Sequence, residues 1–112
     1  MIYHMCPAET WQEAVATGQY TGTADDRRDG FLHFSTADQI AESARRHRAG
    51  EAGLVLVAVD AARLGSRLRW EKSRGGELFP HLHGPLFPDE AASVVPLPLG
   101  PDGHHRFPRL GG

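Results

Sequence analysis

Four titratable side chains stand inside short, otherwise apolar segments of the chain: His4, His33, Glu71 and His81. A charged or titratable group in a strand costs free energy unless it is paired, solvated or used. Because strands that pair bring such positions near one another, we expect these side chains to share a cleft. The alternative is a structural one, in which the histidines in the strands satisfy one another.

Three kinds of chemistry suit such a set. His81 and His83 fall on the same face of a strand, and His33 or His4 would complete three ligands for zinc, although this pair spacing is common. Cys6 and a histidine would form a nucleophilic pair, but nothing near Cys6 in the sequence activates its thiol. The third is nucleotide handling, in which histidine and hydroxyls hold ribose and phosphate while a carboxylate faces a carbon that becomes positively charged.

The segment 29–36 is predicted to be a strand that ends where a helix begins. Alternation places His33 and Ser35 on one face of this strand. Ser35 and Thr36 are each followed, three residues later, by an acidic or amide side chain, which is a helix-capping pattern. A strand-to-helix junction with spare hydroxyls and N–H groups suits an anion or a ribose, and it is also an ordinary way to begin a helix.

The other elements follow from periodicity and apolar runs. Strands are predicted at 2–5, 54–59, 68–71, 78–84 and 93–97, and helices at 7–17, 37–48 and, as a single turn, 89–92. The continuous apolar run at 54–59 predicts a central strand that is buried on both faces. The polar segment 19–29 is expected to be an exposed loop. Two early helices and a β-rich second half indicate an α+β domain.

Length and composition describe an ordinary globular protein. A chain of 112 residues is expected to form a single domain, 1–112, and 40% hydrophobic with 23% charged residues is a usual composition. The net charge of -2 gives no reason to expect nucleic-acid binding. We also expect no membrane segment, since no apolar run approaches ~20 residues, and no signal peptide. The single cysteine fits a cytoplasmic protein.

Motifs along nearly the whole chain occur in the order found in one family. They are Ile2-Tyr3-His4, Trp11, Gly18 to Tyr20, Gly30-Phe31-Leu32-His33-Phe34-Ser35-Thr36, Leu54 to Val59, Trp70 to Gly76, Leu78 to Gly84 and Phe107-Pro108. In these motifs the sequence resembles domain-of-unknown-function family 952, which comprises small uncharacterised bacterial proteins. The family's usual tyrosine between Leu82 and Gly84 is His83 here, which argues against His83 as a metal ligand, and we predict no metal.

This resemblance implies an ADP-ribosyltransferase-like fold, in which a split, mostly antiparallel sheet cradles NAD between its two halves. His4 matches the position that grips the adenosine-side ribose, and His33-Phe34-Ser35-Thr36 matches the nicotinamide side. Glu71 is the candidate catalytic glutamate, with Glu77 in reserve. Arg74 and His81 complete the predicted ligand-binding residues, and NAD is the predicted cofactor.

The activity implied by the resemblance is ADP-ribosyl transfer from NAD or hydrolysis of NAD. Breaking the nicotinamide–ribose bond builds an oxocarbenium-like cation, which a buried carboxylate stabilises more in the transition state than in the ground state. Arg69 stands two residues before Glu71, where arginine-modifying transferases have an acidic or amide residue, so transfer to protein arginines is not expected. The acceptor is left open, and so is the oligomeric state.

Two alternatives remain beside that activity. One is a non-enzymatic module that binds a nucleotide or another phosphate ligand. The other is an RNA 2′-phosphotransferase-like activity, for which Arg27, Arg28 and Arg74 would replace the usual set of basic residues.

Overall fold

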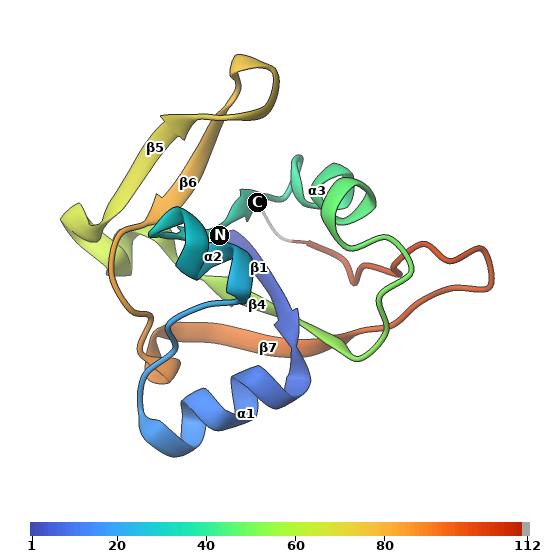
Figure 1. Cartoon of the computed structure of the whole chain (residues 1–112), viewed down its shortest axis with the longest axis horizontal. Helices are drawn as coiled ribbons and strands as arrows, with labels where there is room; N and C mark the ends of the chain where they lie inside the picture. Colours follow the sequence, from blue (N-terminus) through green and yellow to red (C-terminus); the bar gives the residue numbers. More distant parts are fainter. Residues whose placement is uncertain (111–112) are drawn as a thin grey trace.

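Two antiparallel sheets form the framework of the computed structural model, which describes residues 1–110 (Figure 1). The larger sheet has the strand order β3-β1-β4-β7, and the smaller one has the order β2-β6-β5. Every pairing between these strands is antiparallel. The strands are β1 (Ile2–Pro7), β2 (Leu32–His33), β3 (Ser35–Thr36), β4 (Leu54–Val59), β5 (Leu68–Lys72), β6 (Leu78–Leu82) and β7 (Ala91–Leu97). The predicted α+β class is confirmed.

The strand predicted to be central, 54–59, is β4, and it lies inside the larger sheet. β4 pairs with β1 on one side and with β7 on the other, and all its side chains are buried except the half-buried Val55. β1 lies between β3 and β4. Both faces of this sheet are covered, because Trp11 packs with Val57 on one face and Ile40 packs with Met5 on the other.

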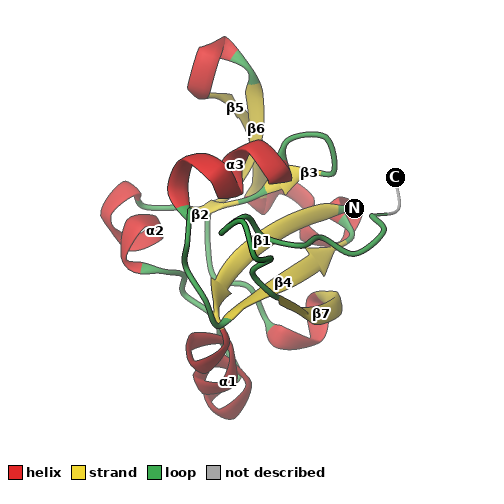
Figure 2. Ribbon diagram, turned by 90° about the vertical axis from the view of Figure 1, so that its right-hand side faces the viewer, coloured by secondary structure: helices red, strands yellow, loops and turns green. Residues whose placement is uncertain are grey.

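Three α-helices precede β4 in the part of the chain that the structure describes: α1 (Ala8–Thr17), α2 (Ala24–Asp29) and α3 (Ile40–His47). Figure 2 shows α1 at one end of the molecule and the β5–β6 ribbon at the other, with α2 and α3 between them. Short 3-10 helices span Ala61–Arg67, Arg74–Gly76 and Pro88–Glu90. Within residues 1–110, no helix is long and apolar enough to cross a bilayer.

The prediction of an exposed loop at 19–29 is wrong in its second half, where the chain forms α2. A capping box begins this helix: Thr23 Oγ1 accepts from the Asp26 N–H at 3.3 Å, and Asp26 Oδ2 accepts from the Thr23 N–H at 2.8 Å. The residue pattern of such a box was present in the sequence, but the segment carries no apolar periodicity. Asp26 itself is buried.

The predicted strand at 29–36 begins only at Leu32, because Asp29 belongs to α2, and it is divided between the two sheets. Its first half, β2, pairs with β6, and its second half, β3, pairs with β1. Phe34 lies between them, fully buried, and its N–H donates to the carbonyl oxygen of Pro80 at 3.0 Å. The chain therefore crosses from one sheet to the other at Phe34.

The predicted capping roles of Ser35 and Thr36 are wrong. A turn follows β3, and α3 begins at Ile40 with Gln39 in the cap position. The Gln39 Oε1 atom accepts from the Thr36 N–H at 3.0 Å, which is one half of the expected pattern. Ser35 is instead buried and shares a hydrogen bond of 2.9 Å with the Ser43 hydroxyl.

Gly22 is a position where neither backbone nor packing accepts a side chain. Its φ is +101°, and a Cβ atom there would lie 2.6 Å from Asp26 Cβ and 2.6 Å from Leu32 Cδ2. Gly30 also has a positive φ, +86°, but open space around it. We expect Gly30→Ala to lower the free energy of unfolding by about 1 kcal/mol through backbone strain, and Gly22→Ala to lower it by about 3 kcal/mol. Urea unfolding measures both, and equal losses would contradict tight packing at Gly22.

Candidate functional site

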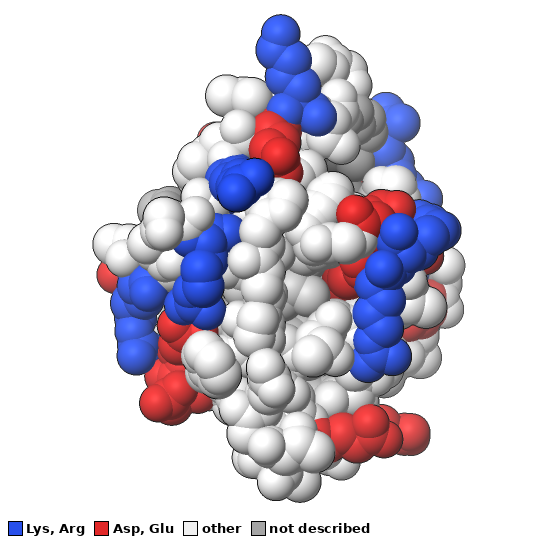
Figure 3. Space-filling model, turned by 60° about the vertical axis from the view of Figure 1, so that its left-hand side comes forward, with Lys and Arg blue, Asp and Glu red and all other residues white. Residues whose placement is uncertain are grey.

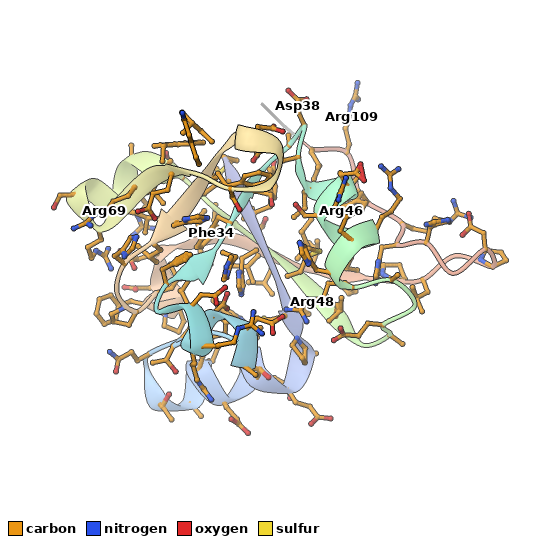
Figure 4. All side chains as sticks on the ribbon, turned by 45° about the horizontal axis from the view of Figure 1, so that its top comes forward. Phe34, Asp38, Arg46, Arg48, Arg69 and Arg109 are labelled. Atoms are coloured by element: carbon orange, nitrogen blue, oxygen red, sulfur yellow. The ribbon has the colours of Figure 1, made fainter. Side chains whose placement is uncertain are left out.

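A cavity of about 160 Å³ is lined by residues from both sheets, α2 and α3. Four of the predicted ligand-binding residues line it: His4 of β1, His33 of β2, Ser35 of β3 and His81 of β6. These residues are far apart in the sequence and come from four strands, which meet where the chain crosses between the sheets. Figure 4 shows Phe34, the residue at this crossing, near the middle of the molecule.

Neither candidate catalytic glutamate lines this cavity. The Glu71 carboxylate lies on the β5–β6 ribbon, 39% exposed, and its Oε1 atom accepts from His81 Nδ1 at 2.9 Å and from His83 Nε2 at 2.8 Å. Glu77 is exposed and accepts a hydrogen bond of 2.8 Å from Gln39 Nε2. The link between Glu71 and the cavity therefore runs through the His81 ring.

The other predicted residues are distributed differently. Thr36 lines a separate hollow, on the side of Trp70. Arg28 lines the cavity, whereas Arg27 does not. The side chain of Arg74 lies outside the described part of the structure.

A buried carboxylate that the sequence reading missed forms one wall of the cavity. Asp26 Oδ1 accepts from His33 Nδ1 at 2.6 Å and from the His33 backbone N–H at 3.1 Å. Burial alone would raise the pKa of Asp26, but these hydrogen bonds and that from the Thr23 N–H bring it down to about 2. Asp26 is therefore ionised at neutral pH, although its side chain is only 2% exposed.

His33 is held between two carboxylates. Nδ1 donates to Asp26, and Nε2 lies 3.0 Å from Asp29 Oδ2. The hydrogen bond to Asp26 and the charges of both carboxylates raise the pKa of His33 above its usual 6.5, against the effect of partial burial. These contacts thus stabilise the imidazolium form, in which both ring nitrogens donate.

His4 is neutral, and both its ring nitrogens are hydrogen-bonded inside the protein. Its Nδ1 lies 2.6 Å from the His33 carbonyl oxygen, and its Nε2 lies 2.6 Å from the Tyr20 hydroxyl. Because a carbonyl oxygen only accepts, Nδ1 carries the proton and Nε2 accepts from Tyr20. Burial lowers the pKa of His4 and raises that of Tyr20, so both keep these roles at neutral pH. Two neighbouring histidines thus have pKa values pushed in opposite directions.

Basic groups and hydroxyls line the rest of the cavity. The Ser35 and Ser43 hydroxyls lie together in its lining, and Arg28 and Arg48 contribute guanidinium groups. Arg48 is 18% exposed, and its ion pairs are long, at 3.4 Å to Glu51 and 4.0 Å to Asp25. Guanidinium has five N–H donors, which is more than these two ion pairs engage. Apolar walls come from Phe34, Ile40 and Phe79.

Metal binding and thiol chemistry gain no support from the geometry. Among residues 1–110, no group of three or more His, Cys, Asp or Glu side chains is placed to hold a metal ion. Cys6 is buried, and this burial raises the pKa of its thiol to about 11, which keeps it protonated.

Comparison with known proteins gives a family and a fold but no activity. The family model described as "Protein of unknown function (DUF952)" matches residues 5–94. The crystal structure of protein CC0527 from Caulobacter crescentus is 43% identical, with a TM-score of 0.90, and the match covers 94% of this chain and 92% of that one. The solution NMR structure of CC0527 is 44% identical over 92% and 89% of the two chains, with a TM-score of 0.83. Among curated proteins, none matches the chain.

The pH dependence of stability tests the ionised state of Asp26. A carboxyl whose pKa is lower in the folded state stabilises the fold above its unfolded pKa, 3.8, and this contribution is lost as the pH falls through the folded value of about 2. Between pH 5 and pH 2, we expect the free energy of unfolding of the wild type to fall by about 2 kcal/mol more than that of Asp26→Asn.

Urea unfolding at both pH values measures this difference, and an NMR titration should show a lower pKa for His33 in the variant. Parallel stability curves together with an unchanged His33 pKa would mean that Asp26 is not the ionised partner of His33.

Proposed function

We propose that this chain, which belongs to the DUF952 family of proteins of unknown function, binds a nucleotide in the cavity lined by both sheets. One observation carries the proposal: side chains that suit ribose and phosphate, from separate strands and from α2 and α3, converge on one small cavity. Four polar residues line this cavity: His33, Ser35, His81 and Arg48. A domain of this size has a small interior, in which polar side chains are costly to bury.

Each part of a nucleotide has a matching wall. Arg28 and Arg48 are suited to phosphate oxygens, because guanidinium donates several N–H groups in a planar fork. Each of the Ser35 and Ser43 hydroxyls both donates and accepts hydrogen bonds, as a partner of a ribose hydroxyl must. The apolar wall at Phe34 suits the face of a base.

The size of the cavity limits how much of the ligand is enclosed. Pockets that enclose a drug-sized ligand measure roughly 300–1,000 Å³. A cavity of about 160 Å³ therefore takes one part of a nucleotide, such as a phosphorylated ribose, and the remainder lies outside. NAD is the leading candidate ligand, because the resemblance implies a split sheet that cradles NAD and two sheets line this cavity.

The contacts of Glu71 favour a protein that binds the nucleotide without cleaving it. Cleavage of NAD needs a carboxylate that faces the reacting carbon, whereas Glu71 reaches the cavity only by way of His81. The hydrogen bond between Glu71 and His81 is still the observation that supports NAD hydrolysis or ADP-ribosyl transfer as a second candidate. An RNA 2′-phosphotransferase-like activity has less support, because basic and acidic side chains are interspersed over the face in Figure 3.

Calorimetric titration with NAD, ADP-ribose and nicotinamide tests the binding proposal. We expect saturable binding of NAD and ADP-ribose to the wild type, and about tenfold weaker binding to Arg48→Ala, since a hydrogen bond to a charged group contributes about 1.5 kcal/mol or more. Arg46→Ala is the matched control, because Arg46 is exposed, lies on the same side of the molecule in Figure 4, and does not line the cavity. Absence of binding by all three ligands would overturn the proposal.

Glu71→Gln separates the two candidates. If the carboxylate acts in the transition state, this variant binds NAD as the wild type does and loses turnover, measured as release of nicotinamide. If the protein is a binding module, neither protein releases nicotinamide. Turnover that is the same in both proteins would exclude Glu71 as the catalytic acid.

A further inference from the structure

The side of His33 that faces solvent is covered by a carboxylate from α2. Asp29 Oδ2 lies 3.0 Å from His33 Nε2, and Asp29 Oδ1 lies 3.1 Å from Arg28 Nε. The two oxygens of one carboxylate thus join an imidazole and a guanidinium, and all three groups line the cavity. A phosphate group also presents two oxygens on one atom and is recognised by the same two kinds of donor.

Helix geometry does not explain the presence of an acid here. Asp29 is the last residue of α2, where a helix terminus disfavours a negative charge. Its side chain is 35% exposed, so it has water available and is not forced against His33 by packing. Asp26, in contrast, is buried and holds the other nitrogen of the same ring.

The balance of charge in the cavity changes with the position of Asp29. With Asp29 facing inward, the carboxylates of Asp25, Asp26 and Asp29 line the cavity together with the guanidinium groups of Arg28 and Arg48. When Asp29 turns outward, the cavity loses one negative charge. The cavity is then more favourable to an anion.

We propose that the donors His33 Nε2 and Arg28 Nε form the subsite for a phosphate group of the ligand, and that the Asp29 carboxylate occupies this subsite until the ligand displaces it. This inference rests on the proposed function, because it names the place of the phosphate within that cavity. Asp29 thereby acts as an internal competitor, which sets the threshold for anion binding.

Removal of the competitor tests the inference. We expect Asp29→Asn to bind ADP-ribose and inorganic phosphate about threefold more tightly than the wild type, because the competing carboxylate is gone and the exposed ion pairs that it makes are weak. Asp25→Asn makes the same charge change on the same helix and in the same cavity but makes no contact with His33 that the structure shows. Its affinity should change by less than that of Asp29→Asn. Calorimetry gives these constants, and Arg28→Ala should weaken binding of both probes.

A second measurement reads the subsite directly. In ¹⁵N spectra of the histidine rings, ADP-ribose should shift the His33 Nε2 signal more than the His33 Nδ1 signal, because Asp26 keeps Nδ1. Equal affinities of the wild type and Asp29→Asn, or equal gains in both aspartate variants, would overturn the inference while the proposed function stands. Failure of ADP-ribose to bind either the wild type or Asp29→Asn would overturn the proposed function, and the inference with it.

Discussion

The hydrogen bonds of one buried carboxylate hold the candidate site together. Asp26 binds both the ring and the backbone N–H of His33, and the His33 carbonyl oxygen accepts from His4. These contacts join three elements: the helix α2, the strand β2 of the smaller sheet and the strand β1 of the larger sheet. An ionised carboxylate is costly to bury without partners. The fold therefore depends on keeping these donors in place, and the cavity takes its shape from them.

A purely structural role explains part of this network but not all of it. Each buried side-chain nitrogen or oxygen in the described residues has a hydrogen-bond partner, as a structural set of histidines requires. His4 fits that description, since both its nitrogens are engaged inside the protein. His33 and Arg48, which line the cavity, do not fit it. The second ring nitrogen of His33 has the partly exposed Asp29 as its partner, and the ion pairs of Arg48 are long. A core built for stability alone would not leave charged donors along an open space.

The sequence predicted the elements whose pattern is local, and it missed those that depend on a few polar residues. The apolar run of β4 and the apolar start of β1 were sufficient to place both strands. α2 was missed because its residues are polar and its signal is one capping box, Thr23 to Asp26. The break at Phe34 was missed because strands of two residues are too short to show a period. Glu71 was predicted to share the cleft because paired strands bring such positions near one another, whereas the position of the β5–β6 ribbon depends on tertiary packing.

The protonation states give the two neighbouring histidines different tasks. The resemblance assigns ribose binding to His4, yet a ring whose two nitrogens are already bonded has no donor or acceptor to offer a ligand. His4 instead fixes the backbone of His33, and Asp26 fixes its ring, so one nitrogen of His33 is left with an exposed partner. The side chain best placed to meet a ligand is therefore the histidine of the Gly30-to-Thr36 motif, and the histidine of β1 acts by positioning it.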